Sequence, residues 1–134
     1  MHDALDCDRV NVFLLDSDKD ELWTKNFKNE FITRIPIKDD LIGICFNKQQ
    51  ILNIRNAYGD NRFDQSLDEI HNYQTNNLML CPIQERRLAM SNMHTMGTST
   101  GVLMLLNKNN GHFNDDDAAT LKSMAQIISV LQHS

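Results

Sequence analysis

The sequence predicts an α+β domain with a central six-stranded antiparallel sheet, and three observations lead to this fold class. Short apolar or alternating runs recur along the chain and are separated by polar turns, as in strands joined by hairpins. Segments with helical character stand between some of these runs, and a long stretch near the end carries apolar residues at helical spacing. Helices between and after strands, without strict strand–helix alternation, favour an antiparallel sheet flanked by helices.

Three strands are predicted in the first part of the chain. Residues 9–16 (RVNVFLLD) form the first, residues 17–20 (SDKD) form a turn, and residues 21–27 continue as the second strand of a hairpin. Residues 31–37 (FITRIPI) alternate between apolar and polar side chains and predict a third strand. Pro36 lacks a backbone N–H group, so we expect this strand to lie at a sheet edge or to end there.

A short helix is predicted next, over residues 40–47 (DLIGICFN), and a strand follows over residues 50–54. Gly43 lies inside this helix, where glycine costs roughly 1 kcal/mol relative to alanine. That cost suggests that the helix packs closely against another group, such as a ligand.

A loop and a second short helix follow. Residues 56–63 (NAYGDNRF) are rich in turn-forming residues and predict the loop. Residues 66–71 fit one or two helical turns, in which Ser66 and Glu69 have the spacing of a capping box.

The last part of the chain combines two buried strands with one long helix. Residues 78–83 (LMLCPI) predict a strand with Pro82 near its end, and residues 102–106 (VLMLL) predict another. Residues 84–100 between them are expected to form an unusually long loop. Residues 115–132 predict the final helix, whose apolar stripe consists of Leu121, Met124, Ala125, Ile128 and Leu131.

The turn before the final helix carries residues suited to joining that helix to the last strand. Asn114 is a good helix cap, and the aspartates after it stand in the first turn, where carboxylates suit exposed N–H groups. Phe113 precedes the cap and is placed to pack back on the helix as a staple. Lys108 at the strand end and Asp117 in the first helical turn are spaced for an ion pair that fixes strand to helix.

Composition and charge exclude several classes of function. The 134 residues suit a single domain, and a net charge of −5 without a basic stripe argues against a nucleic-acid partner. No apolar run approaches the roughly 20 residues that a membrane span needs. Three widely spaced cysteines without a CxxC pair favour free thiols in a reducing cytoplasm, and Cys45 and Cys81 are expected to be buried. The five histidines show no metal-ligand spacing.

Asn107, Lys108, Phe113 and Asp117 resemble the Asn-Lys…Phe…Asp-Glu signature of GAF domains in cyclic-nucleotide phosphodiesterases, with Ala118 in the last place instead of glutamate. Further stretches resemble these domains in order and spacing, over about residues 8 to 117. They are Asp8-Arg9, Val12 to Asp16, Ile35-Pro36-Ile37, Gly43, Leu52-Asn53-Ile54, Asn56-Ala57-Tyr58, Asp60 to Phe63, Tyr73 to Leu78, Cys81-Pro82-Ile83 and Gly101-Val102.

The resemblance implies that residues 1–134 form a single GAF domain of a larger multidomain signalling protein, and residues 1–7 fit the tail of a helix that begins earlier. It also implies a pocket over one face of the sheet. A purine needs a stacking surface and hydrogen bonds at its edge, and a cyclic phosphate needs backbone N–H groups, best supplied by a helix N-terminus. By position, Asn11 and Phe27 would face the base, Leu41 and Ile42 would offer N–H groups to the phosphate, Ala57 and Tyr58 would close a wall, and Asp68, His71 and Thr75 would lie on a lid.

Three pocket positions differ from the better cyclic-GMP binders of this family. Lys28 stands where an acid is frequent, His71 replaces a hydroxyl residue, and Met104 stands where a binder may carry a carboxylate that reads the ligand. Each lost hydrogen bond to a buried ligand edge costs about 1–3 kcal/mol. Two such losses would weaken binding by roughly two to three decades.

Two functions follow from the resemblance. The first is a regulatory domain that binds cyclic GMP or cyclic AMP and allosterically controls an attached catalytic domain. The second is a degenerate domain that binds no nucleotide and serves homodimerisation or contact with a tandem domain, which Ala118 and the altered pocket positions favour.

This domain is not expected to be an enzyme, because the GAF proteins that reduce methionine sulfoxide or hold bilins use cysteine patterns that this chain lacks. No cofactor is expected apart from a cyclic-nucleotide ligand. Catalytic activity of the parent, such as hydrolysis of 3',5'-cyclic nucleotides, would reside outside these residues.

Overall fold

A computed structural model of the chain describes residues 6–25, 30–88 and 95–132. Within them, six strands form one antiparallel sheet in the order β3-β2-β1-β6-β5-β4, which confirms the predicted fold class. The strands are β1 (Cys7–Asp16), β2 (Glu21–Lys25), β3 (Ile32–Pro36), β4 (Leu52–Ile54), β5 (Leu78–Leu88) and β6 (Thr95–Lys108).

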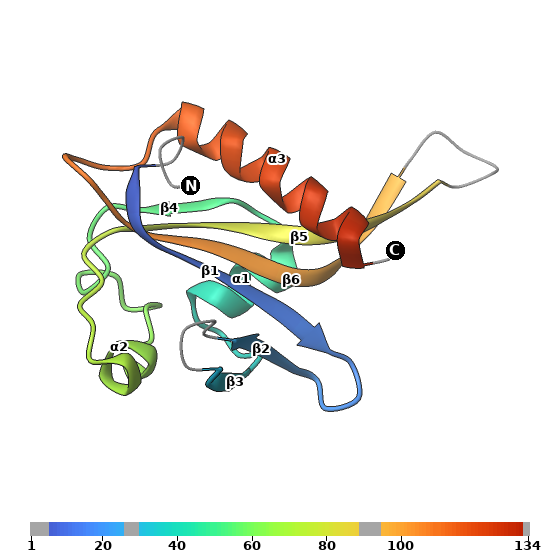
Figure 1. Ribbon diagram of the computed structural model, residues 1–134, viewed down its shortest axis with the longest axis horizontal. Coiled ribbons are helices and arrows are strands. Elements are labelled where there is room, and N and C mark those ends of the chain that lie inside the picture. Colours follow the sequence, from blue (N-terminus) through green and yellow to red (C-terminus); the bar gives the residue numbers. More distant parts are fainter. Residues whose placement is uncertain (1–5, 26–29, 89–94, 133–134) are drawn as a thin grey trace.

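Helices cover both faces of this sheet. Figure 1 shows α3 (Asp115–Gln132) along one face and α1 (Leu41–Lys48) on the other, with the short α2 (Ser66–His71) set apart from both. Two buried hydrophobic clusters lie between these layers, because successive strand residues point to opposite faces. Leu80 and Met104 belong to the cluster on the α1 face, whereas Met79 and Leu105 belong to the cluster under α3.

Several boundaries agree with the predictions. α3 has the predicted bounds, and α1 begins one residue later than predicted, because Asp40 is its cap and not its first residue. β3 lies at the sheet edge and ends at Pro36, as the missing N–H group required. Of the helices in the described part of the chain, none has both the length and the apolar character of a membrane-crossing helix.

The long loop predicted over residues 84–100 is wrong for most of its length. β5 runs on to Leu88 and β6 begins at Thr95, so this region is a hairpin arm, and Figure 1 shows it extending beyond the rest of the sheet. Pro82 therefore lies within β5 and not near its end. Backbone hydrogen bonds hold such an arm without an apolar face, which is why the side-chain pattern gave no strand signal there.

Three smaller expectations also fail. Ser66 is the first residue of α2 and not its cap, which is Gln65, and the Ser66 N–H instead donates to Asp64 Oδ1 at 2.9 Å. Leu131 is 65% exposed, because at about 3.6 residues per turn it is roughly a quarter turn away from the buried line of α3. Cys7 already belongs to β1, so the predicted helical tail does not reach it, and residues 1–5 lie outside the described chain.

Gly43 does pack closely, but against the protein backbone and not against a ligand. A Cβ atom at this position would lie 1.7 Å from the carbonyl oxygen of Lys38. Any side chain would therefore push α1 away from the segment that precedes it, and glycine is required here for the close approach.

Candidate ligand pocket

A cavity of about 210 Å³ lies on the α1 face of the sheet. Residues 56–76, which include α2, lie along one side of it, and we call this segment the lid. Leu78, Met104 and Leu106 contribute apolar side chains from the sheet, and Phe63 contributes an aromatic ring from the lid. The cavity therefore offers apolar surface on opposite sides, which suits a flat ring.

Most of the residues predicted for a pocket lie around this one cavity. Ala57 is fully buried and Tyr58 is 45% exposed, and neither lines the cavity. Phe27, like Lys28, lies outside the described residues. The predicted residues that do line the cavity are Asn11, Leu41, Ile42, Asp68, His71, Thr75 and Met104.

The N-terminus of α1 borders the cavity, but its N–H groups are partly occupied by the protein. Asp40 caps the helix, and its Oδ1 atom accepts a hydrogen bond from the Gly43 N–H at 2.8 Å. The Leu41 N–H, which was expected to face a phosphate, donates to the carbonyl oxygen of Arg62 at 2.9 Å. Burial raises the pKa of the Asp40 carboxyl, because the charged form loses water.

Asp68 is the centre of a hydrogen-bond network inside the lid. Its carboxylate accepts from the Thr75 N–H at 2.8 Å, the Thr75 hydroxyl at 2.8 Å and the Tyr58 hydroxyl at 2.7 Å. Asp68 and Thr75 are both buried, so these bonds fix α2 to the chain that leads into β5. The bond to Asp68 also raises the pKa of Tyr58, because it stabilises the neutral phenol. Asp68 and Thr75, two of the three residues predicted for the lid, thus bind each other.

Tyr73 joins the lid to β1 and β6. Its hydroxyl donates to Asp8 Oδ2 at 2.6 Å and accepts from Asn107 Nδ2 at 2.9 Å, while the Arg9 guanidinium lies 3.9 Å from the ring centroid. Burial and the Asp8 carboxylate both raise the pKa of Tyr73. Sequence reasoning did not select Arg9 or Tyr73 for the pocket. Arg9 is two residues from Asn11 on β1, and this strand periodicity was a signal that could have found it.

Two weaker contacts hold the outer edge of the lid. Lys38 forms an ion pair with Asp64, and this cation, with hydrogen bonds from Ser66, lowers the pKa of the Asp64 carboxyl to about 2. On the other side, Thr33 Oγ1 and His71 Nε2 are 3.3 Å apart. These contacts connect the lid to β3 and to the segment before α1.

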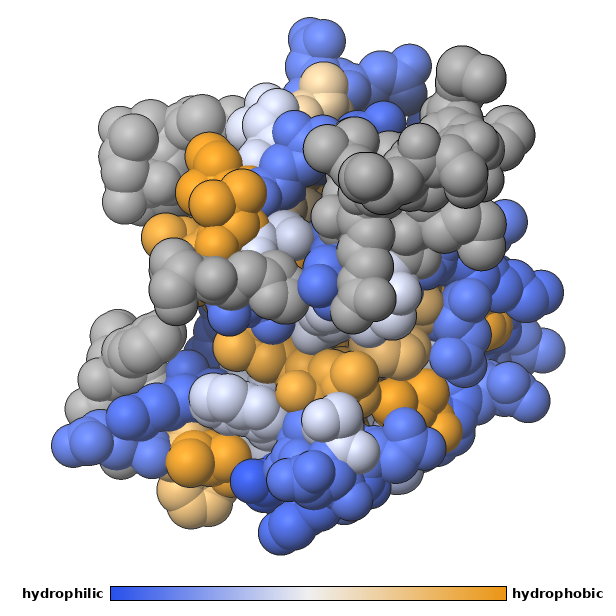
Figure 2. All heavy atoms as spheres, turned by 90° about the vertical axis from the view of Figure 1, so that its right-hand side faces the viewer, coloured by the Kyte–Doolittle hydropathy of each residue, from blue (hydrophilic) through white to orange (hydrophobic). Residues whose placement is uncertain are grey.

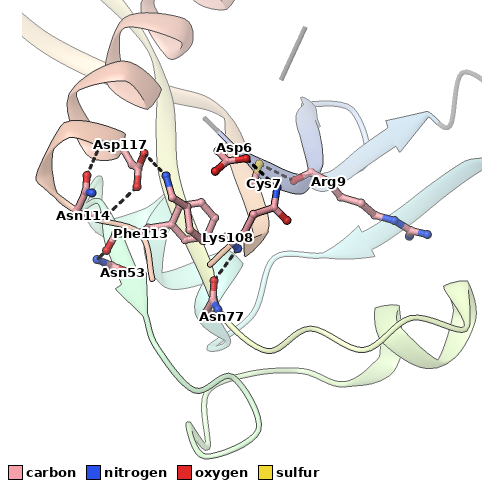
Figure 3. Close-up of polar contacts among 10 residues, drawn as sticks. Asp6, Cys7, Arg9, Asn53, Asn77, Lys108, Phe113, Asn114 and Asp117 are labelled. Atoms are coloured by element: carbon pink, nitrogen blue, oxygen red, sulfur yellow. Dashed lines mark hydrogen bonds and ion pairs between the residues drawn. The ribbon is translucent and has the colours of Figure 1, made fainter. Parts of the chain in front are cut away.

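Three of the signature residues, Lys108, Phe113 and Asp117, lie together where β6 leads into α3 (Figure 3). Lys108 Nζ lies 2.9 Å from Asp117 Oδ1, which confirms the predicted ion pair between strand and helix. Asn114 and Asp117 cap the start of α3 reciprocally, each side chain accepting from the other's N–H at 3.0 and 2.9 Å. Phe113 is buried in the hydrophobic cluster under α3, as expected of a staple. Asn107 Oδ1 accepts from the N–H groups of Asn76 and Asn77, which connect the lid to β5.

The cysteines lie away from this pocket. All three are buried and free, as predicted for Cys45 and Cys81, and among the described lining residues none is a cysteine. Burial raises the pKa of the Cys81 thiol to about 11 and also raises the pKa of Cys45. Both thiols are therefore protonated and unreactive near neutral pH. Nowhere in residues 6–25, 30–88 or 95–132 do three histidine, cysteine or acidic side chains group in a way that would hold a metal ion.

A six-stranded antiparallel sheet with a long helix on one face and a lidded pocket on the other defines a class of regulatory domains. The chain belongs to the GAF domain family, whose family model matches residues 1–131. Among solved structures, the GAF domain from a phosphoenolpyruvate-protein phosphotransferase (ptsP) of Coxiella burnetii superimposes with a TM-score of 0.78 at 18% identity, over 98% of this chain and 76% of that one. At this identity the likeness shows the fold alone.

Curated relatives are cyclic-nucleotide phosphodiesterases. The chain is 24% identical over 143 residues to the probable 3',5'-cyclic phosphodiesterase pde-5 of Caenorhabditis elegans, an alignment that covers 96% of this chain and 18% of that protein. It is 27% identical over 133 residues to the dual 3',5'-cyclic-AMP and -GMP phosphodiesterase 11A of Takifugu rubripes, covering 88% of this chain and 14% of that protein. The chain thus spans less than a fifth of each relative and corresponds to a GAF domain of such proteins.

Proposed function

We propose that this domain binds a cyclic nucleotide, cyclic GMP or cyclic AMP, and thereby controls a catalytic domain attached to it. The observation that carries the proposal is the cavity between sheet and lid, around which most of the pocket residues expected from the sequence gather. Its apolar surfaces suit a purine, and Asn11 is an uncharged polar group that can bond to a purine edge. The phosphodiesterase relatives make a 3',5'-cyclic nucleotide the first ligand to test.

The size of the cavity suggests how binding is transmitted. At about 210 Å³ it is smaller than the roughly 300–1,000 Å³ of typical ligand sites, so a nucleotide enters only when the lid shifts. Tyr73 ties the lid to Asn107, and the next residue, Lys108, is bonded to Asp117 on α3. A ligand that favours one lid position therefore biases the end of β6 and the start of α3, which is the requirement for allosteric control.

Titration calorimetry with cyclic GMP and cyclic AMP tests this proposal. Ile70 on the lid lines the cavity and is 59% exposed, so Ile70→Trp obstructs the pocket without disturbing the core. Ile127→Trp on α3, where the isoleucine is 62% exposed, is the matched control far from the pocket. We expect saturable binding at micromolar concentration that Ile70→Trp weakens and Ile127→Trp does not. No heat with either nucleotide up to millimolar concentration, from a folded protein, would contradict the proposal.

A second candidate function is dimerisation, and one surface favours it. Ile127, Val130 and Leu131 are 62%, 70% and 65% exposed and follow the spacing of one helical stripe on α3. Figure 2, which looks onto the end of the molecule where α3 ends, shows hydrophobic side chains exposed there. Under this alternative, light scattering would give a dimer mass that Ile127→Lys reduces to that of a monomer, and no nucleotide would bind.

A further inference from the structure

The α1 end of the pocket is poorly suited to an anion. Two N–H groups of its first turn already bond to Asp40 and to the Arg62 carbonyl. Asp40 and Asp64 both line this end, and Lys38, which also lines the cavity, is paired with Asp64. Asp40 is only 9% exposed, so a phosphate placed beside its carboxylate would add a second anion where water is largely excluded.

The part of the pocket next to β1 and Tyr73 presents a cation. Arg9 lines the cavity from β1, where it pairs in register with Leu106, another lining residue. Of the cationic lining residues in the described chain, Arg34 is paired with Asp16 and Glu21, and Lys38 is paired with Asp64. Within the same described ranges, no carboxylate lies within ion-pair distance of the Arg9 guanidinium.

Arg9 is also held in place before any ligand arrives. Its guanidinium lies 3.9 Å from the centroid of the Tyr73 ring, and the Tyr73 hydroxyl is fixed by Asp8 and Asn107. Stacking on an aromatic face orients the planar guanidinium and leaves the N–H donors on its edges exposed. Figure 3 shows the Arg9 side chain extending away from the Lys108–Asp117 network. A preorganised donor costs less entropy to engage a ligand than a freely rotating one.

We propose that Arg9 binds the anionic group of the pocket's ligand, with that group at the β1–Tyr73 end of the cavity and not at the N-terminus of α1. The identity of the ligand as a cyclic nucleotide rests on the proposed function, whereas the position of the anion does not. Arg9 is then the residue that distinguishes a nucleotide from its nucleoside. The base lies toward Asn11 and the apolar floor around Met104.

The first test follows the arginine side chains directly. Inorganic phosphate is titrated into the ¹⁵N-labelled domain at constant ionic strength, and the Nε–Hε resonances of Arg9 and Arg55 are compared. Arg55 is exposed on the loop after β4 and serves as the matched reference. We expect a saturable shift at Arg9 and only a weak, non-saturating drift at Arg55. Equal drift at both residues would overturn the anion site, whatever the natural ligand is.

The second test compares each cyclic nucleotide with its uncharged nucleoside, guanosine or adenosine. A charge-assisted hydrogen bond predicts that Arg9→Met weakens cyclic-nucleotide binding about 10- to 100-fold and leaves nucleoside binding unchanged. Arg9→Lys is expected to recover part of the loss, and Arg55→Met to cause none. If Arg9→Met weakened nucleotide and nucleoside equally, Arg9 would only position Tyr73 and the proposal would fall. If no nucleotide bound the unaltered domain, the proposed function would fail while the phosphate titration still decided the role of Arg9.

Discussion

Two lysine–aspartate pairs connect parts of this domain, and their surroundings differ sharply. The Lys108–Asp117 pair joins β6 to α3, and its side chains are only 16% and 6% exposed. The Lys38–Asp64 pair joins the lid to the segment before α1, and its side chains are 50% and 26% exposed. Exposed pairs contribute about 0–1 kcal/mol, whereas breaking a buried pair costs several times more. The same kind of ion pair therefore holds α3 to the sheet strongly and holds the lid weakly.

The difference suits a sensor. Under the proposed function, a lid that shifts to admit a ligand belongs to the less stable part of the structure, and the elements that carry the signal outward belong to the rigid part. The contacts that hold the lid also differ among themselves in burial. The buried Asp68–Thr75 bonds hold the interior of the lid. The Lys38–Asp64 and Thr33–His71 contacts hold only its outer edge.

The largest effect is expected from breaking the buried pair. Lys108→Met leaves the Asp117 carboxylate buried without its cation, and we expect the free energy of unfolding to fall by about 3–5 kcal/mol. Urea denaturation followed by circular dichroism measures this loss. Lys38→Met is the matched control and is expected to cost less than about 1 kcal/mol. Equal losses in the two variants would show that burial does not separate the pairs.

A smaller effect is expected inside the lid. Thr75→Val keeps the shape of the side chain but removes the hydroxyl bond to Asp68, and a bond to a charged group is worth about 1.5–3 kcal/mol. We expect faster amide hydrogen exchange over residues 56–76 and little change in α3. Thr98→Val, at an exposed position of the hairpin arm, is the control. Uniformly faster exchange throughout the protein would mean that Thr75 supports the whole fold and not the lid in particular.

The sequence predicted those parts of the structure that side-chain patterns specify. α3 was found with its full bounds because Asn114 and the aspartates mark its start and apolar residues recur at helical spacing beyond them. The Lys108–Asp117 pair was found because its residues flank a single turn. The β5–β6 arm was missed because backbone pairing beyond the core imposes no apolar alternation on its residues.

In the pocket, the sequence indicated which residues gather but not how they are paired. Asp68 and Thr75 were expected to face a ligand, yet the structure bonds them to each other. The Leu41 N–H was expected to be open, yet Arg62 supplies a carbonyl for it. Such contacts depend on how a loop folds over a helix, which no local spacing encodes. Arg9, in contrast, shares its strand face with Asn11, so the two-residue period of a strand was enough to predict its place in the pocket.

The smallest expected effect is the pH dependence of the stability that the exposed Lys38–Asp64 pair contributes. Lys38, together with hydrogen bonds from Ser66, lowers the pKa of Asp64 from its ordinary 3.8 to about 2. The ion pair therefore stabilises the closed lid above pH 3.8, and this contribution is lost as the pH falls toward 2, when Asp64 takes up a proton. Because Lys38 is half exposed and screened by water, we expect less than about 1 kcal/mol from it. Carboxyl ¹³C NMR should show the Asp64 pKa rising toward its ordinary value in Lys38→Met. An unchanged Asp64 pKa in that variant would mean that hydrogen bonds from Ser66, and not Lys38, lower this pKa. Asp64 would then be held by contacts inside the lid and would not fasten the lid to the segment before α1.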